Sequence, residues 1–111
     1  MEQTNERNAA TVLYIRSNHL ESFNLQKLMG ENFAEQHSLS IDIIADTTTS
    51  RFRSFSVLPG IQKVLQLVEE GIVKSVIVHS LDRVSRDSKQ LLYFIEFLRA
   101  NHAELIILGE V

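Results

Sequence analysis

Four short apolar runs, separated by three longer amphipathic stretches, constrain most strongly what this chain can fold into. The runs read "TVLYIR", "LSIDIIAD", "VKSVIVHSL" and "AELIILG" and are rich in β-branched side chains. Short apolar runs of this composition are typical of strands that are buried on both faces of a sheet. Their alternation with helical stretches predicts an α/β domain in three layers, with a mainly parallel four-stranded sheet covered by helices on both faces.

The stretches between the strands carry apolar residues at helical spacing. The first predicted helix covers about residues 22–36. The second begins near Pro59, a residue suited to a first helical turn, and ends near Gly71. The third, "QLLYFIEFLRANH", follows Asp87, which we predict to be its N-cap in a capping box with Gln90.

The remaining segments are polar. Residues 1–10 lack the basic start and apolar stretch of a signal peptide, so we expect a flexible tail followed by one domain over residues 11–111. The run "TTTSRFRSFSV" has no usable period and predicts a loop, with residues 47–56 as the least ordered internal segment. The core is expected to contain Val12, Tyr14 or Ile15, Ile43, Ile44, Val64, Val68, Val76, Val78, Leu92, Ile95, Ile106 and Ile107.

Composition excludes several classes of protein. The chain has 111 residues, suited to one domain, and 44% apolar residues, enough for a small core. It contains no cysteine and only four scattered histidines, so we expect no disulfide, no metal site and no cofactor. No apolar run approaches the ~20 residues of a membrane span. The expectation is a soluble cytoplasmic protein whose net charge of −3 still allows a local basic patch.

Two polar clusters directly follow predicted strands, "RSN" at residues 16–18 and "DRVSR" at residues 82–86. Ligands of open parallel sheets bind beyond the carboxyl ends of the strands, so the clusters converge if the first and third strands are neighbours. Arg83 and Arg86 can share one face at a helix start, where backbone N–H groups favour an anion. One arginine side chain can donate hydrogen bonds to two phosphate oxygens at once, so this group of arginines predicts a phosphate site. The simpler interpretation is an Asp–Arg ion pair beside a solvated arginine.

Several segments resemble one family. "LDRVSRD", residues 81–87, strongly resembles the "LDRLxR" segment of serine recombinases, the DNA resolvases and invertases. "LYIR", "ESFNLQKLM", "VEEG" and "LLYFIEFLRANHAELIIL" resemble further segments of that family in the same order. The resemblance runs from Thr11 to the end of the last predicted strand and implies the fold of the resolvase catalytic domain.

The resemblance also implies a chemistry. The family cleaves DNA with a serine hydroxyl, forms a phosphoserine link without a metal, neutralises the phosphate with arginines and exchanges strands within a tetramer. By position, the catalytic residues implied here are Arg16, Ser17, Gln26, Asp82, Arg83 and Arg86. Further contacts to DNA or phosphate are expected from Arg51, Arg53 and Lys89.

Two of the departures from the family pattern bear directly on the implied active site. One residue separates the arginine from the serine in the family, and Asn18 stands at that spacing here. A one-residue deletion makes Ser17 the counterpart instead, and counting back from Gln26 supports this. Because side chains alternate along a strand, such a deletion can turn the hydroxyl away. Leu58 stands where the family has an active-site arginine, for which Arg51 or Arg53 could substitute.

Two hypotheses follow. In the first, the chain is a recombinase catalytic domain, either a fragment or a degenerate copy, without the family's long C-terminal helix and DNA-binding domain. The full-length protein would then bind DNA and form dimers or tetramers. In the second, it is a standalone, inactive resolvase-fold protein that acts through protein–protein binding. We expect this chain alone to be inactive in recombination. A general phosphate-binding α/β domain is disfavoured because no glycine-rich turn follows the first strand.

Overall fold

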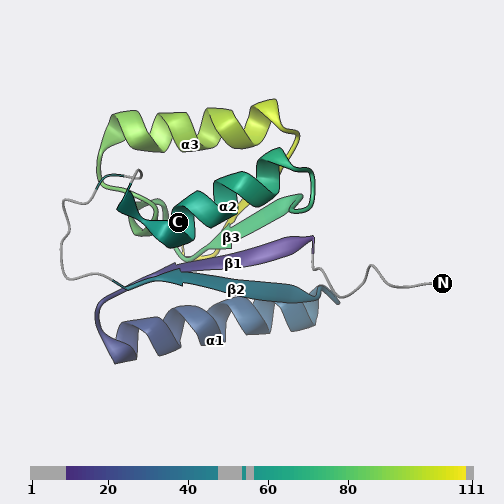
Figure 1. Ribbon diagram of the computed structural model, residues 1–111. Coiled ribbons are helices and arrows are strands. Elements are labelled where there is room, and N and C mark those ends of the chain that lie inside the picture. Colours follow the sequence, from purple (N-terminus) through teal and green to yellow (C-terminus); the bar gives the residue numbers. More distant parts are fainter. Residues whose placement is uncertain (1–9, 48–53, 55–56, 110–111) are drawn as a thin grey trace.

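The computed structural model describes residues 10–47, 54 and 57–109 (Figure 1). The elements are, in chain order, β1 (Thr11–Arg16), α1 (Leu20–Gln36), β2 (Ile41–Asp46), α2 (Pro59–Glu69), β3 (Ser75–Val78), the 3-10 turn η3 (Leu81–Arg83), α3 (Ser88–Ala100) and β4 (Glu104–Ile107). The predicted alternation of strands and helices is therefore confirmed. The predicted loop at residues 47–56 falls almost entirely outside the described residues.

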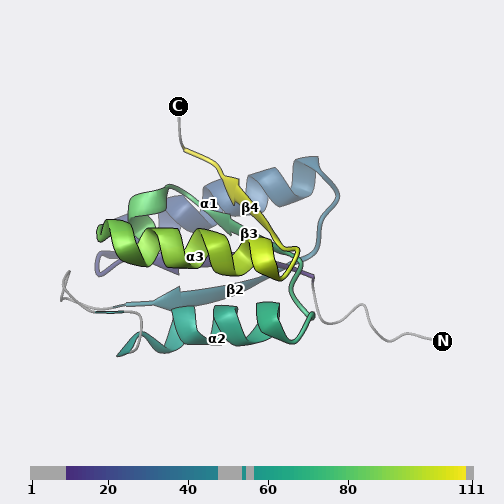
Figure 2. The same cartoon turned by 90° about the horizontal axis from the view of Figure 1, so that it is seen from above.

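The four strands form one parallel sheet in the order β2-β1-β3-β4. β1 pairs with β2 and with β3, so the first and third strands are neighbours, as the convergence of the polar clusters requires. α1 covers one face of the sheet, and α2 and α3 cover the other (Figures 1 and 2). The predicted three-layer α/β architecture is confirmed.

The core consists of two clusters separated by the sheet. The larger lies between the sheet and α2 and α3, and β1 contributes Val12 and Tyr14 to it. The smaller faces α1 and contains Leu13 and Ile15 of β1 together with Ile77. β1 is thus buried on both faces, and its side chains alternate between the two clusters.

Two of the expected core residues are wrong. The side chain of Leu92 is 60% exposed because it lies on the outer side of α3, whereas Phe94 and Leu98 of that helix are buried. The side chain of Ile43 is 37% exposed because β2 is an edge strand of the sheet. The other members are buried or partly buried.

The helix ends follow local sequence signals with one difference. α2 begins at Pro59, and Gly71, just past its end, has a φ of 77°, a conformation that glycine adopts without strain. Asp87 caps α3 by accepting from the backbone N–H of Lys89 at 2.8 Å. The reciprocal half of the predicted capping box is absent, because the N–H of Asp87 donates to the Ser85 hydroxyl at 3.0 Å.

Ala10, the residue before β1, forms backbone hydrogen bonds with the start of β3. The carbonyl of Ala10, which we assigned to the flexible tail, accepts from the backbone N–H groups of Lys74 and Ser75 at 2.7 and 3.1 Å. These bonds tie the start of β1 to the start of β3. Residues 1–9 lie outside the described part of the chain.

Candidate functional site

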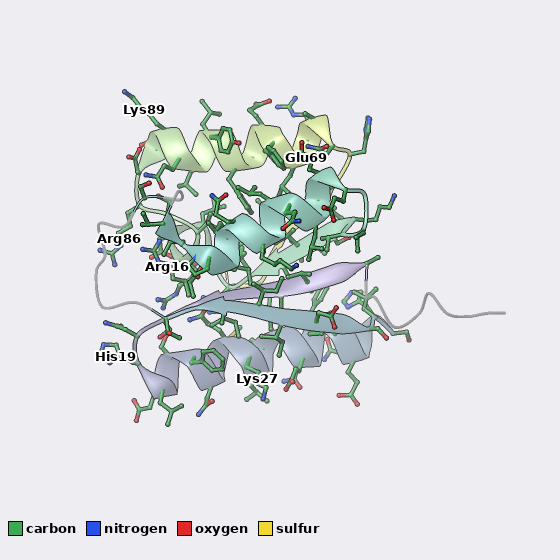
Figure 3. All side chains as sticks on the ribbon, in the orientation of Figure 1. Arg16, His19, Lys27, Glu69, Arg86 and Lys89 are labelled. Carbon is green, nitrogen blue, oxygen red and sulfur yellow. The ribbon has the colours of Figure 1, made fainter. Side chains whose placement is uncertain are left out.

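The carboxyl ends of β1 and β3 bring the two polar clusters together. Nη1 of Arg16, the last residue of β1, donates to the carbonyl of Val84 at 3.2 Å, which links the first cluster directly to the second. Arg16 and Arg86 lie at the same end of the molecule in Figure 3, with His19 and Lys89, and Glu69 lies at the other end. The predicted convergence is therefore observed, and it concentrates cationic side chains at one edge of the sheet.

Ser17 follows Arg16 but has its own local partners. Its backbone N–H donates to the carbonyl of Asp46 at 3.2 Å. Its hydroxyl donates to the carbonyl of His19 at 3.0 Å and accepts from the N–H of His19 at 3.1 Å. Short polar side chains commonly form such bonds just before a helix. The hydroxyl is thus held by the turn that leads into α1.

Arg16 and Ser17 leave β1 on opposite faces of the sheet. Alternation along the strand places Arg16 on the face of Tyr14 and Ser17 on the face of Ile15. The bond of Arg16 to Val84 agrees, because Val84 belongs to the cluster between the sheet and α2 and α3. Because Arg16 and Ser17 are consecutive, their side chains point to opposite faces of the sheet. With one residue between them, as in the family, the two side chains would share a face.

Gln26 lies beside this strand end, as its assignment to the site implies. Its side chain is only 2% exposed. Nε2 donates to the carbonyl of Arg16 at 3.3 Å and to the hydroxyl of Ser22 at 3.1 Å, whereas the buried Oε1 has no partner in the described residues. The two bonds donated by Nε2 fix the orientation of the amide, so the unpaired atom is an acceptor.

The second cluster does not form the ion pair of the simpler interpretation. Asp82 is exposed and accepts from the Ser80 hydroxyl at 2.5 Å, and in the described part of the chain it forms no ion pair with Arg83 or Arg86. Arg83 is half-buried, and its Nε is buried without a partner there. Arg86 is exposed. The two arginines are consequently not neutralised by Asp82.

The side chain of Asp87 lies at the start of α3, where we expected backbone N–H groups to favour an anion. The carboxylate of Asp87 occupies that position by accepting from the N–H of Lys89. A second anion there would meet this negative charge. Any phosphate at this edge would depend on the side chains of the arginines and of the exposed Lys89.

Asp46, at the end of β2, is a buried polar residue that the sequence analysis missed. Its Oδ2 accepts from the Tyr14 hydroxyl at 2.7 Å and from the N–H of Ile61 at 2.8 Å, and its Oδ1 accepts from the N–H of Gly60 at 2.6 Å. It thereby caps α2, whose N-cap residue, Leu58, has no side-chain acceptor. The absence of a capping residue before Pro59 was the available signal for a remote cap.

Burial is the main reason why the pKa of Tyr14 is raised well above its ordinary value. The hydrogen bond to Asp46 and the negative charge of that carboxylate raise it further, while Arg16 opposes the shift. The phenol is therefore a fixed hydrogen-bond donor inside the fold.

The position of the expected family arginine is part of the core. The side chain of Leu58 is 2% exposed and packs in the cluster between the sheet and α2 and α3. The two candidates for its replacement, Arg51 and Arg53, lie outside the described residues. Leu58 contributes packing and no charge.

No metal site or membrane span is found in residues 10–47, 54 and 57–109. No group of three or more His, Asp or Glu side chains in this part of the chain is arranged to hold an ion. None of the helices described here has the length and apolar character needed to cross a bilayer.

The buried polar atoms that lack a partner gather at the carboxyl edge. Among the described residues they are Oε1 of Gln26, Nδ1 of His79 and Nε of Arg83. Gln26 contacts the end of β1, and His79 and Arg83 follow β3. Buried polar groups are nearly always paired in folded proteins, so the three unpaired atoms mark the carboxyl edge as the candidate site.

Comparison with known proteins identifies the family. The model of the resolvase N-terminal domain matches residues 11–111. Comparison with curated proteins finds no match. Three similar solved structures are the N-terminal catalytic domain of TP901-1 integrase, the C-terminal catalytic domain of ISC1926 TnpA, an IS607-like serine recombinase, and a resolvase family site-specific recombinase from Streptococcus pneumoniae.

The three structures share the fold at low sequence identity. The integrase domain is 24% identical with a TM-score of 0.78, over 89% of this chain and 76% of that one. The TnpA domain is 19% identical with a TM-score of 0.73, over 88% and 66% of the two chains. The Streptococcus pneumoniae recombinase is 21% identical with a TM-score of 0.72, over 88% and 70%. Because the family model covers all of the domain from Thr11 onward, the chain belongs to the resolvase N-terminal domain family, the catalytic domains of serine recombinases.

Proposed function

We propose that this chain is a serine-recombinase catalytic domain that binds a DNA phosphodiester at the carboxyl edge of its sheet and takes part in DNA recombination in the cytoplasm. One observation carries the proposal: Arg83 and Arg86, which form no ion pair within the described residues, lie at the edge where buried polar atoms also lack a partner in that part of the chain. Arginine side chains are suited to phosphate oxygens because they donate two parallel hydrogen bonds.

In the proposed reaction, the Ser17 hydroxyl attacks the phosphorus. A bond forms between Oγ and phosphorus, the bond from phosphorus to one deoxyribose oxygen breaks, and the serine proton ends on that sugar oxygen. Arg16, Arg83 and Arg86 neutralise the charge that develops on the phosphate, and Gln26 supports the strand end. Asp82 can orient the arginines only after it leaves the Ser80 hydroxyl, its partner in this structure.

This reaction requires Ser17 to leave its turn. Its hydroxyl must give up two hydrogen bonds to His19 before it can approach a phosphate. Two neutral hydrogen bonds contribute about 1–3 kcal/mol in total, a cost that the binding of DNA could offset. Cleavage therefore requires a rearrangement of residues 17–19, the turn that precedes α1.

A second candidate function is that of an inactive resolvase-fold protein that acts through binding to another protein. It is favoured by the opposite faces on which Arg16 and Ser17 leave β1. It is also favoured by the burial of Leu58, which contributes no charge to the edge. The two candidates differ in whether a covalent link to DNA forms.

Phosphate binding is tested by the salt dependence of DNA affinity. Duplex DNA of arbitrary sequence suffices, because phosphate contacts do not depend on sequence. Arg83→Ala and Arg86→Ala should each weaken binding and flatten the slope of log K against log salt by about 0.9. Arg99→Ala is the matched control, because Arg99 is exposed, lies near the end of α3 and pairs with Glu96 at 3.1 Å. Equal slopes for all of these proteins would overturn the proposed phosphate site.

Cleavage is tested by trapping a covalent protein–DNA species on a supercoiled plasmid library with random inserts. The test uses this chain and any longer natural form of it, because the proposal includes a larger recombinase that dimerises or tetramerises on DNA. An adduct that is lost in Ser17→Ala and retained in Asn18→Ala would support the enzyme. An adduct that persists in Ser17→Ala would refute the assignment of the nucleophile. DNA binding without any adduct would favour the second candidate.

A further inference from the structure

His79 and Gly109 join the ends of β3 and β4 beside the candidate site. Beyond the last paired residues of these two strands, the backbone N–H of Gly109 donates to the carbonyl of His79 at 2.6 Å. His79 lies two residues before Leu81, at which the η3 turn begins, and Arg83 is the last residue of that turn. The link between the strands therefore lies at the start of the segment that carries the arginines of the second cluster.

The backbone of Gly109 also packs closely against the side chain of His79. A Cβ added at Gly109 would lie 2.7 Å from both Cε1 and Nε2 of the imidazole and 3.1 Å from the carbonyl oxygen of His79. Nδ1 of the same ring is buried, so the ring has protein on that side as well. A methyl group at position 109 would consequently displace the imidazole and press on the backbone of His79.

The contact itself favours a glycine at position 109. Gly109 does not have a positive φ, so its backbone conformation is open to other residues. The imidazole forms no hydrogen bond through Nδ1 in the described residues, and a buried nitrogen without a partner costs free energy. What the ring of His79 contributes to the fold at this point is packing, which holds the ends of the two strands at a fixed separation.

The η3 turn has two attachments to the sheet on either side of Arg83. The first is the link of His79 to the end of β4. The second is the bond from Nη1 of Arg16 to the carbonyl of Val84. Ser80, the N-cap residue of the turn, makes no capping bond with its side chain. The position of Arg83 therefore depends on where the chain leaves β3, which is the point that His79 fixes.

We propose that His79, packed on Gly109, is a positioning residue for Arg83 in the phosphate site and acts without contact to DNA. The packed pair fixes the point at which the chain leaves β3, and the η3 turn begins from that point. The inference rests on the proposed function of the carboxyl edge. It adds to that function a contact between the ends of β3 and β4.

Gly109→Ala places one methyl group in this contact. We expect DNA binding about tenfold weaker, and a slope of log K against log salt flatter by up to about 0.9, because a displaced Arg83 loses its phosphate contact. Gly71→Ala is the matched control. Gly71 follows α2 at the end of the molecule where Figure 3 shows Glu69, and alanine there strains a backbone with a φ of 77° but meets no atom within 4 Å. Its affinity should equal that of the wild type at a temperature at which all the proteins are folded.

Two double variants show whether the effect acts through His79 and Arg83. His79→Ala should also weaken binding about tenfold, but it leaves room for the methyl group. Adding Gly109→Ala to His79→Ala should therefore cause no further loss, whereas independent effects would multiply to about a hundredfold. Gly109→Ala should likewise have no effect in an Arg83→Ala protein. Multiplied losses in either double variant would overturn the inference.

Restoring a ring at position 79 tests the role of packing. His79→Phe provides a planar side chain against Gly109 and has no unpaired nitrogen. It should recover most of the affinity that His79→Ala loses. Binding by His79→Phe as weak as that of His79→Ala would contradict a role for the packed ring.

Hydrogen exchange separates this inference from the proposed function because it needs no DNA. The N–H of Arg83 donates to the carbonyl of Ser80 at 3.1 Å. Its exchange, relative to that of core amides, should accelerate in Gly109→Ala and His79→Ala but not in Gly71→Ala. Faster exchange in these variants of a protein that fails to bind DNA even as the wild type would refute the phosphate site and retain the positioning of η3. Wild-type affinity and exchange in a folded Gly109→Ala, or in His79→Ala if the first variant does not fold, would overturn the inference.

Discussion

Replacement of Ser17 by alanine should destabilise the fold even in the absence of DNA. The hydroxyl accepts from the N–H of His19 and donates to its carbonyl, at 3.1 and 3.0 Å. Asn18 and His19 are exposed, so water can reach the groups that the mutation frees. The loss is therefore expected to resemble that of other side chains at helix starts, about 1 kcal/mol within a range of about 0.5–2 kcal/mol.

The measurement is equilibrium unfolding in urea together with thermal melting. For a domain of this size, a loss of about 1 kcal/mol corresponds to a fall in Tm of roughly 3–6 °C. Ser40→Ala is the control, because Ser40 is exposed in the connection before β2 and should change stability by less than about 0.5 kcal/mol. If Ser17→Ala proved as stable as Ser40→Ala, the hydroxyl would not be held by the turn, and the argument that it must leave that turn before attack would fail.

Ser17→Asn separates the structural role of the hydroxyl from the chemical one. An asparagine side chain can accept from the backbone N–H two residues later, as the serine does, but it has no hydroxyl to attack a phosphate. We expect stability close to that of the wild type and no covalent adduct with DNA. An unstable Ser17→Asn protein would show that the turn depends on the donated bond to the carbonyl of His19.

Two further predictions concern the packing of the sheet and its buried phenol. Gly30→Ala should destabilise the protein by up to about 2 kcal/mol in urea unfolding. A Cβ there would lie 2.6 Å from Cδ1 of Leu13, and overpacking costs about 1–3 kcal/mol, against a gain in helix propensity of about 1 kcal/mol. A more stable variant would contradict the close packing of α1. Because burial and then Asp46 raise the pKa of Tyr14, the folded state keeps a proton that the unfolded state loses above about pH 10. The stability that this group contributes is thus fully present below that pH. Above it, the free energy of unfolding falls by up to about 1.4 kcal/mol per pH unit. Tyr14→Phe should remove this part of the pH dependence, as measured by urea unfolding between about pH 9 and 11.

The fold was predictable because its signals are local. Each strand is a short apolar run and each helix has apolar residues at helical spacing, so the alternation follows from neighbouring residues alone. Ile43 and Leu92 were placed in the core wrongly because a pattern of apolar residues does not reveal which strand lies at the sheet edge or how wide the buried face of a helix is. Those facts depend on how the elements pack.

The site was predictable where it depends on strand order and not where it depends on contacts between distant elements. The neighbouring positions of β1 and β3 bring Arg16 to the 82–86 loop, as expected. The cap of α2 comes from Asp46, which precedes Gly60 by 14 residues in the chain. Capping rules consider only the residues next to a helix start, so they could not predict this contact. The start of α3 is predicted to favour an anion, and Asp87, the N-cap that the sequence also predicts, accepts from the N–H of Lys89 there.

The spacing between arginine and serine decides which hypothesis this chain fits, and it can be changed without altering the length of the chain. Ser17→Val combined with Asn18→Ser converts "RSN" into "RVS", which places a serine at the spacing of the family. If alternation along β1 continues to this position, the new hydroxyl lies on the face of Arg16. An adduct with DNA that is formed by the double variant and not by the wild type would show that the protein is a recombinase domain disabled by one missing residue. If the wild type forms the adduct and the double variant does not, Ser17 is the nucleophile and the turn before α1 opens during the reaction.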